Sequence, residues 1–146
     1  MYNINQYNDL ELSILSCLLL KPELMNDLTL EDKYFTKHQR LWQFMKSFYN
    51  KFKTFDCVLM CEVCKDKYQL MNNIVLLLET EPIPDNFYKY QKELIEIYNE
   101  LEKDKYIRNK VYELANNLMV KNINVSDFRN KVDEIYKNAN EIFKEK

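Results

Sequence analysis

The stretch NVSDFRNKVDEIYKNANEIF at residues 124–143 does most to indicate the fold of this chain. Its apolar residues recur in steps of 4, 3, 4 and 3: Phe128, Val132, Ile135, Ala139 and Ile142. This spacing lines them up along one side of an α-helix and is typical of a heptad seam that packs against a second helix. Asn124, with Asp127 three positions on, predicts where the helix begins, because both side chains suit the free N–H groups of a first turn.

A second helix-compatible segment, roughly residues 85–121, precedes the seam. Its apolar residues form two stripes at helical spacing: Leu94, Tyr98 and Leu101, then Ile107, Val111, Leu114 and Leu118. Only the short loop KNINV at 121–125 separates the two helices, which predicts an antiparallel hairpin. Tyr136 and Phe143 widen the apolar surface beyond what one partner helix covers. Two interpretations stay open: the hairpin folds back onto the first 80 residues, or it associates with other chains.

The first 84 residues also carry a helical pattern, broken by prolines and by residues that suit helix N-termini. We expect helices at about 8–21, 22–28, 36–51, 56–67 and 69–79, with a brief helix after Thr29 and a break at TEPIP, residues 80–84. The expected caps are Asn8 or Asp9 for the first of these helices, Thr36 for the third, and Thr54 or Asp56 for the fourth. The predicted fold class is therefore all-α: a compact helical head at 1–84, followed at 85–146 by the helical hairpin and the start of a linker.

The composition excludes several classes of function. The 146 residues contain no glycine, and phosphate-cradling loops need glycine where the backbone approaches the ligand, so neither a Walker A loop nor a G-x-G-x-x-G turn is present. The formal charge of −2 lacks the basic excess typical of direct DNA binding. Apolar runs are far too short for a membrane span or a signal peptide. We expect a soluble, cytoplasmic protein without a cofactor.

The segment CVLMCEVC at 57–64 holds three of the four cysteines in C-x3-C-x2-C spacing, as in iron–sulfur sites of radical enzymes. On a helix, Cys61 lies about 40° to one side of Cys57 and Cys64 about 20° to the other, so all three share one face. A zinc site would need a fourth ligand, yet Cys17 belongs to another helix and His38 is the only histidine. We therefore interpret the cysteines as small apolar packing residues, with a metal enzyme as the alternative.

The residues in order resemble the N-terminal domain of the DnaB family of bacterial replicative helicases. The resemblance begins with the acidic and apolar run Glu11–Leu20 and continues with the turn EDKYF at 31–35, then His38 and Arg40. It goes on through FDCVLM at 55–60 and PIPDNFYKY at 82–90, and ends in the helical hairpin. In that family, mostly leucine and alanine stand where this chain has Cys57, Cys61 and Cys64.

The resemblance implies a non-catalytic role in DNA replication. The family's domain forms the collar of a ring helicase, in which dimers assemble into a hexamer, and it docks primase and contacts helicase loaders. DNA contact would be indirect, and there would be no catalytic, cofactor-binding or metal-binding residue. The expected interaction residues, which serve hairpin packing and self-association, are Leu94, Tyr98, Leu101, Ile107, Val111, Leu118, Phe128, Val132, Ile135 and Ile142.

Two alternatives accompany this interpretation. The helicase-binding C-terminal domain of a primase shares the head-and-hairpin layout and would bind helicase instead. The chain would also suit a free-standing phage or mobile-element protein that modulates a host helicase, as well as a domain excised from a full helicase, in which the ATPase would follow.

Overall fold

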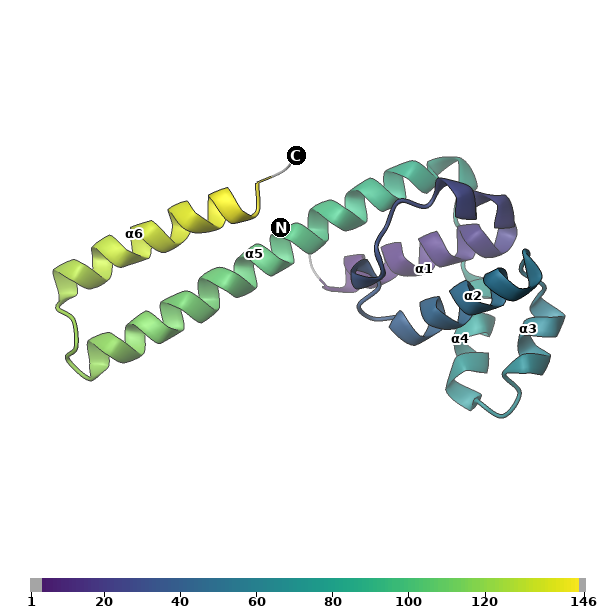
Figure 1. The fold of residues 1–146 in the computed structure, drawn as a ribbon, viewed down its shortest axis with the longest axis horizontal. Helices are drawn as coiled ribbons and strands as arrows, with labels where there is room; N and C mark the ends of the chain where they lie inside the picture. The colour runs from purple at the N-terminus through teal and green to yellow at the C-terminus, as the bar shows by residue number, and fades with distance from the viewer. Residues whose placement is uncertain (1–3, 145–146) are drawn as a thin grey trace. The chain divides into compact units, whose positions relative to one another are not determined.

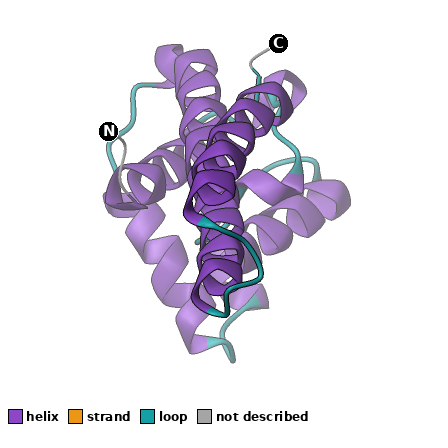
Figure 2. Ribbon diagram, turned by 90° about the vertical axis from the view of Figure 1, so that its left-hand side faces the viewer, coloured by secondary structure: helices purple, strands orange, loops and turns teal. Residues whose placement is uncertain are grey.

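The computed structural model describes residues 4–144, and within them all regular structure is helical. The predicted all-α class is confirmed (Figure 2). The chain divides into two compact units, Met1–Glu96 and Ile97–Lys146. The domain boundary predicted after residue 84 stays a prediction, but residues 87–96 of the long helix α5 belong to the first unit.

The first unit, here called the head, contains five helices and three short 3-10 segments. Their bounds are α1 Ile4–Leu20, η1 Pro22–Asp27, η2 Asp32–Tyr34, α2 Gln39–Phe52, α3 Cys57–Val63, α4 Tyr68–Glu79, η3 Pro84–Asn86 and the start of α5 Phe87–Met119 (Figure 1). Helix α4 contacts α1, α2 and α3. The head is therefore organised around α1 and α4.

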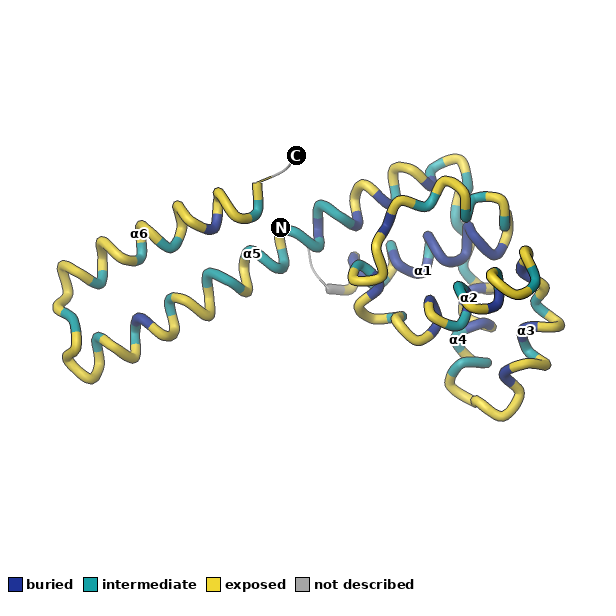
Figure 3. The backbone as a smooth tube through the Cα atoms, viewed as in Figure 1, coloured by how far each residue is buried: buried dark blue, intermediate teal, exposed yellow. Residues whose placement is uncertain are grey.

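The head has an apolar core, and Figure 3 marks the buried positions of α1 in dark blue. Side chains from each of its helices are fully or almost fully buried: Ile14, Leu15, Leu18, Leu41, Met45, Met60, Ile74, Leu77 and Leu94. Burying one such side chain contributes about 1.5–3 kcal/mol, so this core supplies most of the head's stability. It also holds α2 and α4 next to each other.

The start of α5 is tied to the head by a buried amide. Gln91 is 2% exposed, and its Oε1 accepts a hydrogen bond from the backbone N–H of Thr29 at 2.8 Å. Its Nε2 donates to the carbonyl of Asp27 at 3.3 Å. Both polar atoms of the amide are thus satisfied, which a buried polar group requires.

Three predicted helix boundaries were wrong, and side-chain hydrogen bonds explain two of them. The first helix begins at Ile4 rather than near Asn8, because Asn8 is not a cap and its Oδ1 contacts Nε2 of His38 at 2.6 Å. Helix α2 begins at Gln39 rather than after Thr36, whose hydroxyl donates to Glu11 at 3.4 Å. The cysteine helix ends at Val63 rather than Lys67, and a turn of exposed charged residues follows it.

The second unit contains the rest of α5 and helix α6, Val125–Ile142. The rings of Tyr106 on α5 and Phe143, just after α6, meet edge to face with centroids 5.9 Å apart. Figure 1 shows α6 running back along the second half of α5. Asn124 caps α6, because its Oδ1 accepts from the N–H of Asp127 at 2.8 Å, and this confirms the predicted cap.

Two helices end with a lysine in the left-handed region, a conformation that glycine usually supplies. Lys53 after α2 has φ 58°, and its N–H donates to the carbonyl of Tyr49 at 2.7 Å. Lys121 after α5 has φ 63° and donates to Leu118 at 3.1 Å. Since the chain has no glycine, lysine takes this position at both turns.

Candidate protein-interaction surfaces

A buried carboxyl joins α1 to the start of α2. Glu11 is fully buried, and its oxygens accept hydrogen bonds at 3.2 Å from the backbone N–H groups of Lys37 and His38. These N–H groups belong to the two residues immediately before α2, so Glu11 ties α1 to the segment that leads into α2. Burial raises the pKa of Glu11 to about 7, although the hydrogen bonds from Lys37, His38 and Thr36 oppose this shift. These contacts fix the position of α2.

The single histidine takes part in the same arrangement. His38 is half-buried, and its Nε2 lies 2.6 Å from Oδ1 of Asn8. Burial, and secondarily the charge of Lys37, lowers the pKa of His38 below 6.5. A neutral imidazole held by an amide orients two segments of the head. We therefore assign His38 a structural role.

The cysteines pack as apolar side chains. Cys64 is buried at the end of α3, and Cys57 and Cys61 are half-buried. Burial raises the pKa of both Cys57 and Cys64 above the usual value. In α1, burial raises the pKa of Cys17 to about 11. Protonated thiols are weak nucleophiles and poor metal ligands, so their surroundings favour packing over metal binding.

Within residues 4–144, no group of three or more His, Cys, Asp or Glu side chains is placed to hold an ion. Nor does any helix in that range combine the length and apolar character needed to cross a membrane.

The predicted seam residues of the second unit are mostly half-buried. This group comprises Tyr98, Leu101, Ile107, Val111, Leu118, Phe128, Val132 and Ile135. Ile142 differs, since 58% of its surface is exposed. The most buried residues between Tyr106 and Phe143 are Leu114 and Ala139, at 8% and 0% exposed. Both belong to the predicted stripes, although they are not among the expected interaction residues.

Leu94 lies apart from the other expected interaction residues. It is fully buried within the head, on the part of α5 that carries Gln91. A buried leucine stabilises the head and offers no surface to a partner. We therefore leave it out of the interaction surface discussed below.

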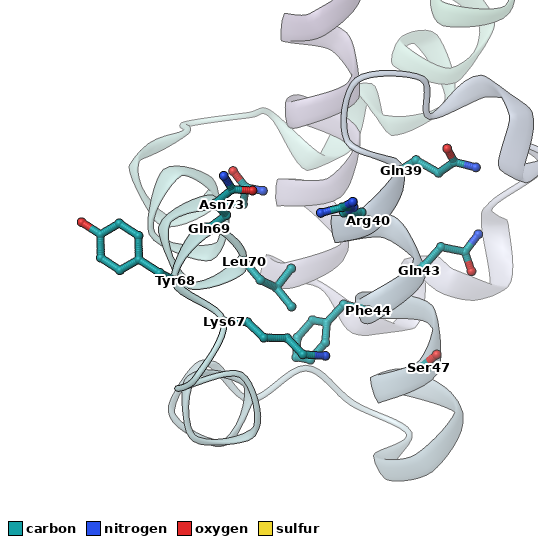
Figure 4. A pocket seen from close by; sticks show the side chains of 10 residues that line it. All are labelled: Gln39, Arg40, Gln43, Phe44, Ser47, Lys67, Tyr68, Gln69, Leu70 and Asn73. Carbon is teal, nitrogen blue, oxygen red and sulfur yellow. The ribbon is translucent and has the colours of Figure 1, made fainter.

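The sequence did not indicate a groove between α2 and α4 (Figure 4). Its volume is about 900 Å³. Ten residues line it: Gln39, Arg40, Gln43, Phe44, Ser47, Lys67, Tyr68, Gln69, Leu70 and Asn73. Phe44 on α2 is half-buried at the groove. No signal in the sequence could have located the groove, because it depends on how two helices separated in sequence pack.

Comparison with known proteins gives a match to a protein family. Residues 3–96, well over half of the chain, match the family described as DnaB-like helicase N terminal domain. No curated protein and no solved structure matches the chain. The family match and the compact head both end at Glu96, so the second unit lies outside the match.

Proposed function

Since this chain belongs to the DnaB-like helicase N-terminal domain family, we propose that it is a non-catalytic collar domain of DNA replication. In this proposal it acts in the cytoplasm, associates with copies of itself through α5 and α6, and docks primase or a helicase loader. It has no ATPase activity of its own and contacts DNA only through its partners. The family supports a role with a replicative helicase, and the partners belong to the proposal.

The observation that carries self-association is the incomplete burial of the seam in the second unit. Two helices cover only one stripe of each other, and bundles normally bury the remaining apolar surface with further helices. On α6, Val132 and Ile135 are half-buried, while Tyr136 and Ile142 are 52% and 58% exposed. A second copy of the unit would supply the missing helices and cover these residues.

The charge on these helices suits such an association. Lysines and acidic residues alternate along the exposed side of α6, for example Lys131, Asp133, Glu134 and Lys137. A rim of mixed charge around an apolar strip selects partner and orientation without preventing contact. The second unit therefore has both the apolar strip and the polar rim of an association surface.

Light scattering after size-exclusion chromatography tests the proposal. Wild-type protein should have the mass of a dimer or a larger assembly, and purified primase should increase that mass. Ile135→Asp and Ile142→Asp should both give monomers, because an unpaired charge in an apolar interface costs several kcal/mol. Ile142→Asp is the cleaner variant, since its side chain is already exposed and its replacement leaves the packing of α6 on α5 intact.

Asn130→Asp is the matched control. It places the same charge on an exposed position of the same helix, outside the seam, and should leave the assembly unchanged. Fluorescence of Trp42, which is buried in the head, verifies that the head of each variant is folded, and circular dichroism verifies that its helices remain. A wild-type protein that is monomeric at all concentrations would refute self-association.

A further inference from the structure

The groove between α2 and α4 has an apolar floor and a polar rim. Phe44 and Leu70 are half-buried and point toward each other between the two helices (Figure 4). Tyr68 points away from the groove and is 78% exposed. The volume of about 900 Å³ lies within the range of pockets that enclose a ligand. The floor therefore has room for an apolar side chain from a partner.

The groove is positively charged, in contrast to the head around it. Arg40 on α2 and Lys67 just before α4 line it, and no acidic residue does. Within residues 4–144, neither of these two cations forms an ion pair with a carboxylate. Asp and Glu nevertheless outnumber Lys and Arg over residues 1–96. Two uncompensated cations attract a ligand with one or two negative charges, whereas a long polyanion is normally bound by many more cations than these.

Four carboxamide side chains line the groove, and their hydrogen-bonding groups indicate whether a bound peptide is extended or helical. Gln39 and Gln43 come from α2, and Gln69 and Asn73 come from α4. Each carboxamide donates and accepts hydrogen bonds, which matches the N–H and C=O groups of an extended peptide backbone. A helical peptide satisfies those groups internally and would leave the carboxamides without a backbone partner.

We infer that this groove binds an extended acidic peptide segment of a partner protein. One apolar side chain of the segment rests on Phe44 and Leu70, its carboxylates pair with Arg40 and Lys67, and the carboxamides hold its backbone. The inference goes beyond the proposed collar function, because the groove lies entirely within the head and does not involve the surface of α5 and α6.

Fluorescence anisotropy of the full chain with three labelled peptides tests this inference. Each peptide has ten residues with one central leucine, flanked by aspartates in the first, asparagines in the second and lysines in the third. The aspartate peptide should bind at least about tenfold more tightly than the lysine peptide, with the asparagine peptide between them. In nuclear magnetic resonance spectra, it should shift the side-chain NH2 signals of Gln43 and Asn73.

The double variant Arg40→Glu and Lys67→Glu should reverse the order of the three peptides. Both side chains are exposed, so the head should remain folded. The control Lys89→Glu reverses an exposed charge on the head outside the groove and should preserve the wild-type order. Light scattering should give the same mass for the double variant and wild type, which separates this test from that of self-association.

Several results would overturn the inference. These are equal binding of the three peptides, no binding of any peptide at millimolar concentration, or an equal loss of affinity in the Lys89→Glu control. Tighter binding of a ten-nucleotide oligothymidine than of the aspartate peptide would instead identify the groove as a nucleic-acid site.

Discussion

Replacing Glu11 with glutamine should remove a pH dependence from the stability of the head. Glu11 is fully buried, and its pKa of about 7 compares with 4.5 for an ordinary glutamate. The folded state therefore binds this proton more tightly than the unfolded state does. The stabilisation of the folded state by this proton is complete below about pH 4.5 and is lost as the pH rises through 7.

The two pKa values set the size of the effect. Linkage over this interval predicts that wild-type protein loses about 2 kcal/mol of stability between pH 5.5 and pH 8 through Glu11 alone. Glutamine has nearly the same shape and does not ionise. Its carbonyl can accept from the N–H groups of Lys37 and His38, and its NH2 can donate to the hydroxyl of Thr36. The stability of Glu11→Gln should consequently lack this slope.

Urea unfolding at a series of pH values, followed by Trp42 fluorescence, measures the difference. Trp42 reports on the head because it is 2% exposed and stacks on Phe35 with ring centroids 4.7 Å apart. His38 acts with the opposite sign, since its lowered pKa removes stability as the pH falls below 6.5. Both proteins contain His38, so its contribution cancels in the difference between them. Glu93→Gln, at an exposed position of α5, is the matched control and should follow wild type.

Parallel curves for wild type and Glu11→Gln between pH 5.5 and pH 8 would contradict this reasoning. They would mean that the hydrogen bonds from Lys37, His38 and Thr36 compensate fully for the burial of the carboxylate. A large loss of stability in Glu11→Gln at every pH would mean that glutamine does not reproduce the hydrogen bonds that Glu11 makes with Thr36, Lys37 and His38.

Two further substitutions test the local structure. Asn124→Ala removes the cap of α6 and should lower the free energy of unfolding by about 1 kcal/mol. Circular dichroism should show this as a lower midpoint of thermal unfolding. The control Asn130→Ala, at an exposed position in the same helix, should not lower that midpoint. Cys61→Ala should cost on the order of 1 kcal/mol, because the side chain is half-buried, and the absorption spectrum of wild type should show no visible band that the variant lacks. The loss of such a band would point to a metal centre.

The helical spacing of apolar residues predicted the helices well, because a helix that buries one side needs apolar residues at that spacing. The stripe Ile107, Val111, Leu114 and Leu118 lies on α5, and the heptad seam lies on α6. Asn124 is confirmed as a cap, and Asp56 is the one of the two candidates, Thr54 and Asp56, that caps its helix; each accepts from an N–H only three residues along the chain. Local patterns of this kind depend on the helix itself and are visible in the sequence.

Contacts between distant residues could not be predicted in the same way. Asn8 and Thr36 had the composition of caps, yet each bonds to a group more than twenty residues away. The groove likewise depends on the packing of α2 against α4. Sequence periodicity identifies which face of a helix is apolar, but the partner of a polar group and the space between two helices follow from the tertiary structure.

The left-handed lysines at 53 and 121 have a consequence for the denatured ensemble. Each costs about 1–2 kcal/mol in the native state relative to glycine. An average chain of this length has about 10 glycines, and each glycine replaced by another residue restricts the denatured chain by about 0.4–1 kcal/mol. Summed over the whole chain, the free energy gained by restricting the denatured state exceeds the free energy lost at the two left-handed lysines. A backbone without glycine thus has less conformational entropy to lose on folding, and this favours the native state over the denatured ensemble.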